Sequence, residues 1–173
     1  AEPAWLVRLT AFSSGLNRLA AFVAITLVVL MTGLILLEIG LRVFSLSTHV
    51  TDAWVGYGVA AVTFLSMPWV LEQNSMLKVA VLVSRLSSGI RLAVEFVGIL
   101  LSLAAILFLT TYQWAAVMKL IHRGTVSQHY IPVPLWLPEG VFFAGLVLLA
   151  LHLFVRLLRL CLLRQGSEDI LTV

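Results

Sequence analysis

The sequence predicts an all-α membrane protein with four transmembrane helices and an interfacial amphipathic helix between the second and the third. Of its 173 residues, 61% are apolar and only 11% are charged, and the mean hydropathy is +1.09. Soluble domains are roughly 45–50% apolar and about 25% charged. Four stretches are also long enough to cross a hydrocarbon core of about 30 Å, which takes about 20 helical residues. This composition excludes a soluble enzyme and a disordered partner protein.

The first expected helix has no charge between Leu19 and Leu37. Its apolar core is longer than the 7–15 residues usual in a cleaved signal peptide, so we expect it to be retained. All the spans belong to a single expected domain, residues 1–173. The four helices are expected at about residues 19–42, 53–73, 92–119 and 137–160.

The second and fourth helices are bounded by residues typical of a membrane interface. Trp54 and Trp69 lie near the two ends of the second helix, where the apolar ring and polar N–H of an indole fit the aromatic belt. The loop before the fourth helix contains Pro132 and Pro134, and Pro138 lies near the first turn of that helix. Prolines favour extended backbone, which predicts a stiff, extended loop.

The interfacial helix is expected within residues 74–91. Lys78 and Arg85 are seven residues apart in a segment rich in Met, Leu, Val and Ile. That pattern is typical of a helix lying in the membrane surface with its polar edge toward the headgroups. The alternative is a plain cytoplasmic extension of the third helix, although Ser87, Ser88 and Gly89 form a natural break.

Basic residues are distributed unequally between the two sides of the predicted bundle. Eight lie on the side of the termini, against three on the other side. The first group is Arg8, Arg18, Lys78, Arg85, Arg91, Arg156, Arg159 and Arg164, and the second is Arg42, Lys119 and Arg123. The positive-inside rule therefore predicts that both termini are cytoplasmic.

Two pairs of opposite charges are expected at the interface. Glu38 and Arg42 are four residues apart, as are Arg91 and Glu95, so each pair shares a helix face. Charges within a membrane often serve an ion or proton pathway. Because these residues lie at helix ends, we interpret them as self-neutralised structural pairs.

No catalytic, cofactor or metal site is expected. His152 lies in the inner part of the fourth helix, and no second histidine is expected at its depth, as a haem with two axial ligands would require. We interpret it as a hydrogen-bonded packing residue. The four histidines and Cys161 are too scattered for a zinc site. The sequence also shows no nucleophile paired with a base, no phosphate loop and no carboxylate cluster.

A contact surface for a larger partner is expected on the third helix. Gly98 and Ser102 form a small-xxx-small step, which lets another helix approach closely. The four spans do not show two similar halves with broken helices, which is the layout expected around a transport site. The chain therefore looks like a partner of something larger. We expect it to bind no nucleic acid, because its basic residues are not clustered with aromatic residues.

The order of motifs resembles the small membrane (Q) subunit of tripartite ATP-independent periplasmic (TRAP) transporters. The first helix closes with the sequence Glu38–Phe44, similar to the family's arginine–aromatic ending. Asp52–Trp54 opens the second helix, and Met76–Val79 follows it. Ser127–Trp136 leads into the fourth helix, which contains Gly145. These pieces extend over about residues 20–160.

The resemblance implies a non-catalytic scaffold subunit in the bacterial inner membrane. In this family the small subunit pairs with a large elevator-type subunit that holds the substrate and sodium sites, and a periplasmic binding protein delivers the solute. Transport is driven by an ion gradient, usually of sodium. We expect the large subunit to be an obligate partner, the binding protein a transient one, and membrane lipids to surround both.

The outer loop is the expected docking surface for the binding protein, because it presents Lys119, Arg123 and His129. Basic residues speed encounter with an acidic partner. The rival hypothesis is a membrane anchor of a redox complex, which would require histidine ligands on facing helices.

Overall fold

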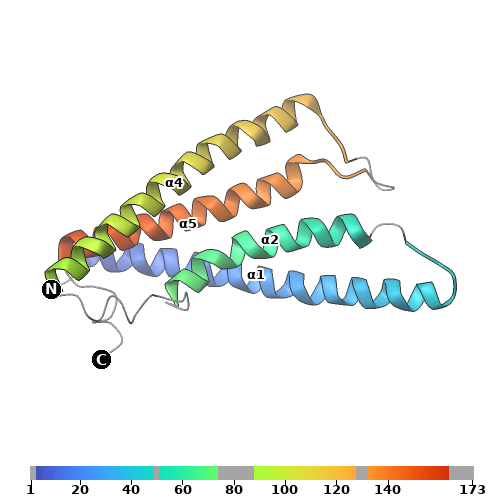
Figure 1. The fold of residues 1–173 in the computed structure, drawn as a ribbon, viewed down its shortest axis with the longest axis horizontal. Helices are drawn as coiled ribbons and strands as arrows, with labels where there is room; N and C mark the ends of the chain where they lie inside the picture. Colours follow the sequence, from blue (N-terminus) through green and yellow to red (C-terminus); the bar gives the residue numbers. More distant parts are fainter. Residues whose placement is uncertain (1–2, 49–50, 74–87, 128–131, 164–173) are drawn as a thin grey trace.

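The chain folds into a bundle of long helices in a computed structural model (Figure 1). The structure describes residues 3–48, 51–73, 88–127 and 132–163. Within them, all four helices are long and apolar enough to cross a membrane, as predicted. They are α1 (Ala4–Val43), α2 (Thr51–Glu72), α4 (Ser88–Arg123) and α5 (Trp136–Leu163).

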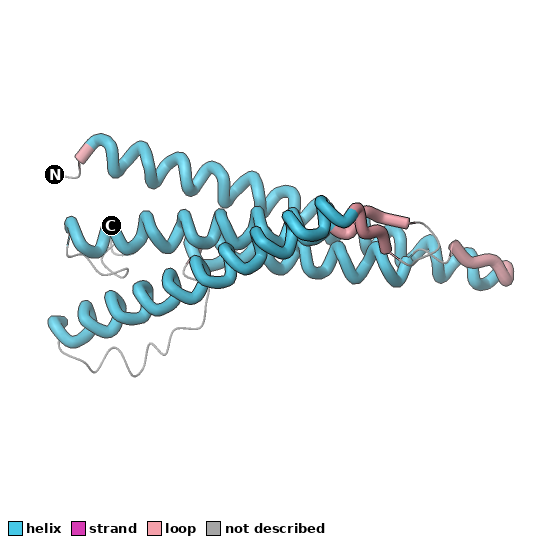
Figure 2. Tube along the Cα trace, turned by 90° about the horizontal axis from the view of Figure 1, so that it is seen from above, coloured by secondary structure: helices cyan, strands magenta, loops and turns pink. Residues whose placement is uncertain are grey.

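The helices form two antiparallel hairpins, α1 with α2 and α4 with α5 (Figure 1). At one end of the bundle, called the terminal end here, α1 begins, α2 ends, α4 begins and α5 ends. The opposite end, called the loop end, carries the α1–α2 turn and the α4–α5 loop (Figures 1 and 2). Helix α5 packs against each of the other three, whereas α4 packs mainly against α5.

Helix α1 begins at Ala4, well before the expected start at residue 19. The added turns contain Arg8 and other polar residues, so an apolar window excludes them. One face of this segment is nevertheless buried, at Leu6, Ser13 and Asn17. Packing against the other helices therefore extends the helix beyond its apolar part.

Two apolar clusters hold the helices together. One packs Ala20 and Ala24 of α1 against Leu65 of α2, and the other packs Leu103 of α4 against Leu149 and Leu153 of α5. The small alanines let α1 and α2 lie close together. The clusters also include half-buried side chains of α5 and α2, respectively, so both hairpins share one interior.

A proline and a glycine set the distance between α2 and α5. Pro68 is buried inside α2 and has no N–H to donate to the Phe64 carbonyl four residues earlier. Gly145 of α5 lies against that carbonyl: a Cβ added there would come within 2.7 Å of the Phe64 oxygen. Any larger residue would have to displace backbone.

Of the predicted interfacial helix, residues 74–91, the structure describes the last four residues. Residues 74–87 lie outside the described residues, and residues 88–91 form the first turn of α4. Helix α4 begins at Ser88, within the break that the sequence suggests.

Candidate functional site

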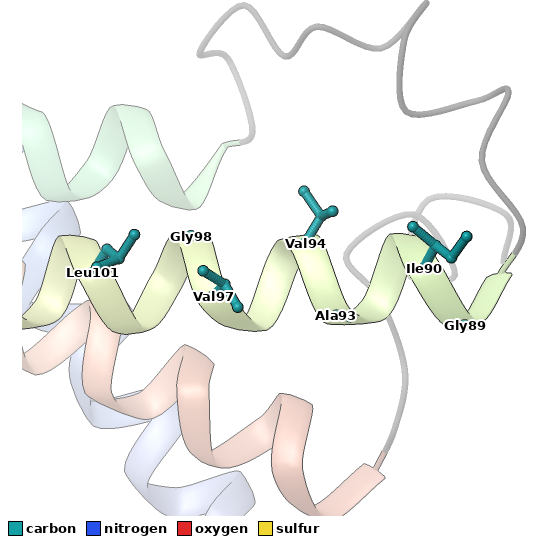
Figure 3. Close-up of a pocket in the computed structure, with 7 residues that line it drawn as sticks. All are labelled: Gly89, Ile90, Ala93, Val94, Val97, Gly98 and Leu101. Carbon is teal, nitrogen blue, oxygen red and sulfur yellow. The ribbon is translucent and has the colours of Figure 1, made fainter.

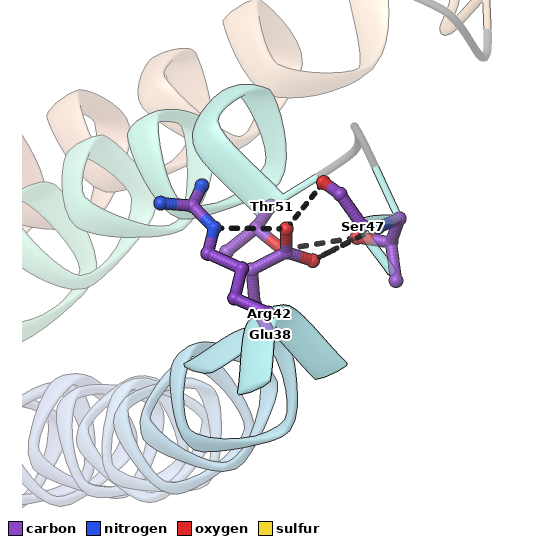
Figure 4. Close-up of polar contacts among 5 residues, drawn as sticks. Glu38, Arg42, Ser47 and Thr51 are labelled. Carbon is purple, nitrogen blue, oxygen red and sulfur yellow. Dashed lines mark hydrogen bonds and ion pairs between the residues drawn. The ribbon is translucent and has the colours of Figure 1, made fainter. Parts of the chain in front are cut away.

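At the loop end, the Glu38 carboxylate of α1 is held by the hydroxyl-rich α1–α2 turn (Figure 4). It accepts hydrogen bonds from Ser47 Oγ at 2.6 Å and from the Thr48 backbone N–H at 3.1 Å. The Thr48 and Thr51 hydroxyls also donate to it. A carboxylate with this many donors needs no cation to remain charged.

Arg42 makes the predicted contact with Glu38, but the contact is long and the Arg42 side chain is mostly exposed. Arg42 Nε lies 3.4 Å from Glu38 Oε1, and the side chains are 65% and 5% exposed, respectively. An exposed ion pair contributes about 0–1 kcal/mol. The hydroxyl groups, which the pairing hypothesis did not use, are the main partners of Glu38.

At the terminal end, Asn17 joins three helices through a polar cluster that the sequence analysis did not anticipate. Its Nδ2 donates to Glu72 Oε2 of α2 at 2.7 Å. The same nitrogen lies 3.1 Å from His152 Nδ1 of α5. His152 is therefore hydrogen-bonded, as interpreted from the sequence, and Asn17 is its partner.

The same cluster contains buried polar atoms without a partner. Asn17 and Ser13 are only 1% and 2% exposed. Among the described residues, Asn17 Oδ1 and Ser13 Oγ have no hydrogen-bond partner. Such atoms cost free energy and call for an explanation.

Glu95 of α4 forms an ion pair with Arg156 of α5, in which Arg156 Nη2 lies 2.9 Å from Glu95 Oε1. Both side chains are about one-fifth exposed. The side chain of Arg91, the partner expected for Glu95, lies outside the described residues. The pair with Arg156 links α4 to α5 one helical turn after His152.

The α4–α5 loop is folded back on itself at the loop end. The Ser127 N–H donates to the Val133 carbonyl at 2.8 Å, and the Leu135 N–H donates to that of Thr125 at 3.1 Å. Gln113 Nε2 of α4 donates to the Glu139 carboxylate of α5 just below the loop. The described part of the loop is thus a closed, paired segment.

The basic residues expected in the outer loop lie in the last turns of α4. Lys119 and Arg123 are exposed there, and Gly124, with φ of 58°, ends the helix in the left-handed conformation usual for a glycine cap. His129 lies outside the described residues. The two described cations are therefore held on a helix rather than on an extended loop.

Gly98 and Ser102 are exposed on α4. Gly98 lies beside Val94, Val97 and Leu101 along an open apolar groove (Figure 3). A Cβ added at Gly98 would meet nothing within 4 Å. No other described helix covers this side of α4 beside Gly98.

The described residues contain no group of three or more His, Cys, Asp or Glu side chains that could hold a metal ion. The polar contacts described above lie toward the two ends of the bundle, around Glu38 and Gln113–Glu139 at the loop end and around Asn17 and Glu95–Arg156 at the terminal end. Asn17 and Glu72 escaped the sequence analysis because they border the apolar stretches. An ionisable or amide side chain adjoining a span is the signal that could have found them.

Comparison with known proteins agrees with this architecture. Residues 31–162 match the sequence model of the family described as tripartite ATP-independent periplasmic transporters, DctQ component. The match includes parts of all four helices. No curated protein and no solved structure gives a match.

Proposed function

Since the chain belongs to the DctQ component family of tripartite ATP-independent periplasmic transporters, we propose that it is the non-catalytic scaffold subunit of a sodium-coupled TRAP transporter. The family match over residues 31–162 is the observation that carries this proposal. In this role the chain supports a large elevator-type subunit, its obligate partner, which binds the solute and the sodium ions. The complex lies in the bacterial inner membrane.

A stationary scaffold suits the distribution of polar groups in the chain. Glu38 is bound by neutral hydroxyls, and Glu95 by Arg156. These groups are engaged in contacts that hold the α1–α2 turn and the α4–α5 pair together. We also propose that the chain, residues 1–173, is a single domain, as suits a part that stays fixed while its partner moves.

The uncovered side of α4 is the proposed contact surface for the large subunit. Gly98 and Ser102 are exposed there, and small residues let a partner helix approach closely. The Gly98→Leu substitution should therefore weaken co-purification of the large subunit.

Gly33→Leu is the matched control, because a Cβ at Gly33 of α1 also meets nothing within 4 Å. We expect Gly98→Leu to reduce the large subunit recovered with the tagged chain at least several-fold, and Gly33→Leu to leave it unchanged. Equal loss in both variants would assign no special role to α4. A Soret band in the purified wild-type sample would instead favour the redox-anchor alternative.

Docking of the periplasmic binding protein is proposed at the loop end. Lys119 and Arg123 are exposed in the last turns of α4, next to a loop whose ends are paired. A preformed surface loses less conformational entropy on binding, and its charges attract an acidic partner. His129 follows in the same loop.

Charge reversal tests this surface. The double variant Lys119→Glu with Arg123→Glu should raise the half-saturating concentration of binding protein in an uptake assay at low salt. The control variant Arg8→Glu with Arg18→Glu makes the same change at exposed positions of the terminal end. An unchanged half-saturating concentration in the first variant would contradict docking at this end.

The proposed topology has both termini in the cytoplasm, supported by the basic residues in the terminal half of the bundle. In a Cys161→Ser background, an impermeant thiol reagent should label Val126→Cys in intact cells and leave Trp5→Cys unlabelled. Both wild-type side chains are about half exposed, so they are comparable sites. Labelling of Trp5→Cys alone would contradict this topology and indicate the opposite orientation.

A further inference from the structure

A stripe of side chains along one face of α1 carries a single charge. This α1 stripe contains Ser14, Arg18, Phe22, Ile25 and Val29, which follow one another at intervals of three or four positions and so share a helix face. We propose that Arg18 binds the headgroup phosphate of an anionic phospholipid, whose acyl chains lie along the three apolar side chains of the stripe. This site goes beyond the scaffold role, which requires no particular lipid.

The described helices leave the α1 stripe uncovered. Phe22, Ile25 and Val29 are 68%, 61% and 66% exposed, and Arg18 is exposed as well. Ala20, which packs in the contact with α2, lies about half a turn around the helix from Arg18. The stripe therefore faces away from the bundle, toward whatever surrounds the chain in the membrane.

Two levels of polar contacts indicate the depth of Arg18 in the membrane. Asn17, in the contacts at the terminal end, and Glu38, in those at the loop end, are 21 positions apart on α1. Their partners on α2, Glu72 and Thr51, are also 21 positions apart. At about 1.5 Å per residue the two levels are about 30 Å apart, the thickness of a hydrocarbon core. Arg18 follows Asn17 directly, so it lies where the hydrocarbon meets the headgroups.

The charge of Arg18 is available to a ligand from outside the bundle. Among the side chains that the structure describes, none forms an ion pair with Arg18, whereas Arg156 at the same end is paired with Glu95. A guanidinium stays charged and can donate two parallel hydrogen bonds to a phosphate. Ser14 lies one turn nearer the headgroups on the same face, so its hydroxyl can donate to the same phosphate. A cation at this depth attracts anionic lipid in particular.

The apolar part of the α1 stripe suits acyl chains better than a packed helix. Its three apolar side chains are bulky, whereas Gly98 and Ser102 on α4 are small and let a helix approach closely. Beside the stripe, the hydroxyls of Thr26 and Thr32 donate to carbonyls of their own helix, at 2.9 and 2.8 Å. Polar groups that face hydrocarbon must be satisfied in this way. The stripe is therefore assigned to lipid, and the uncovered side of α4 to the large subunit.

Native mass spectrometry of the delipidated full chain in detergent tests this site. The chain is titrated with phosphatidylglycerol, which is anionic, or with phosphatidylcholine, which carries a phosphate but no net charge. We expect phosphatidylglycerol to bind the wild type more tightly than phosphatidylcholine. Arg18→Gln should weaken binding of the first phosphatidylglycerol about five-fold, the effect expected of one basic residue at an anionic surface, and leave phosphatidylcholine unchanged. Arg18→Lys keeps the charge and should retain most of the preference.

Arg8→Gln is the matched control, because Arg8 is also exposed on α1. It lies ten positions, about 15 Å, nearer the N-terminus, which is beyond the depth of the headgroup phosphates. Arg8→Gln should therefore leave the affinity for phosphatidylglycerol unchanged. Circular dichroism should show equal helix content in all variants, since only exposed side chains are replaced.

Three results would overturn the proposal. The first is an unchanged affinity of Arg18→Gln for phosphatidylglycerol. The second is an equal loss in Arg8→Gln, which would mean that net charge, rather than a site, attracts the lipid. The third is that Arg18→Gln binds lipid normally but recovers less of the large subunit, which would assign the α1 stripe to a protein contact. The Gly98→Leu test of the α4 surface is independent of all three.

Discussion

Both ends of the bundle contain carboxylates beside apolar helix surfaces, but the partners of these carboxylates differ between the two ends. At the loop end, the hydrogen-bond partners of Glu38 among the described residues all lie within thirteen positions of it in the sequence. At the terminal end, Asn17 reaches partners 55 and 135 positions away, and Glu95 reaches one 61 positions away. The Glu38 contacts therefore close one hairpin, and Gln113 with Glu139 links the two helices of the other, whereas the contacts at the terminal end join all four helices.

This difference predicts which substitutions will disturb each end. Local contacts form with little loop-closure entropy and stabilise one turn. Contacts between distant segments form only when the helices are correctly packed. Damage to packing should therefore disturb the terminal end first, and damage to Glu38 should stay near the α1–α2 turn.

The largest loss of stability should follow Gly145→Leu. This substitution changes the distance between α2 and α5, on which the contacts at the terminal end depend. The new side chain would meet the backbone of Phe64, so α2 and α5 must separate. Overpacking costs typically 1–3 kcal/mol, and we expect at least about 3 kcal/mol because backbone cannot yield easily. Thermal unfolding in detergent, with the His152 NMR signal as a probe of the terminal end, checks this.

Gly140→Leu is the control on the same helix, because a Cβ at Gly140 meets nothing within 4 Å. It should leave the unfolding temperature and the His152 signal nearly unchanged. Equal destabilisation by both substitutions would mean that helix propensity, rather than the approach of Gly145 to Phe64, limits stability.

The next largest effect is expected from Glu38→Ala at the loop end. It removes the acceptor of several hydrogen bonds, and bonds to a charged group contribute about 1.5–3 kcal/mol each. Because the freed hydroxyls of the turn can reach water, we expect a net loss of about 2–3 kcal/mol. Hydrogen exchange should accelerate around Thr48 and stay unchanged around Asn17; acceleration at both ends would remove the distinction between them.

A smaller loss of stability is expected when one member of the Glu95–Arg156 ion pair is removed. Removing one member of a buried pair costs about 3–5 kcal/mol, but these side chains are about one-fifth exposed, so about 1–2 kcal/mol is expected for Arg156→Gln. Adding Glu95→Gln should recover part of this loss in a double-mutant cycle of unfolding free energies. Purely additive losses would show that the two side chains do not interact.

The smallest effect should follow Arg42→Ala. Its side chain is 65% exposed, so a loss below about 1 kcal/mol is expected. Chemical unfolding in detergent is sensitive enough to compare it with Glu38→Ala. If the two variants lose equal stability, the ion pair, and not the hydroxyl groups, holds Glu38.

Local physics explains what the sequence could predict. Hydropathy found the four spans, because each contains an uninterrupted apolar stretch. It missed the first turns of α1, where polar residues such as Asn17 are buried by tertiary packing. Helical spacing brought Glu38 and Arg42 to one face, but it could not supply the turn hydroxyls that bind Glu38 across the helix boundary.

The terminal end could not be predicted in the same way. No spacing rule relates Asn17 to Glu72 or His152, because their contact depends on how the two hairpins pack. Nothing in the sequence around Pro68 or Gly145, taken separately, indicates that α2 and α5 approach each other there. Their relation becomes apparent only when α2 and α5 are placed side by side.

Reconstituted uptake tests the scaffold role most directly. Proteoliposomes receive the large subunit and the binding protein with or without this chain, and solute uptake is measured over a range of sodium concentrations. The scaffold account predicts that uptake requires the chain and that Glu38→Ala leaves the sodium dependence unchanged in complexes that assemble. Full uptake by the large subunit alone, or loss of sodium dependence in the assembled variant, would contradict it.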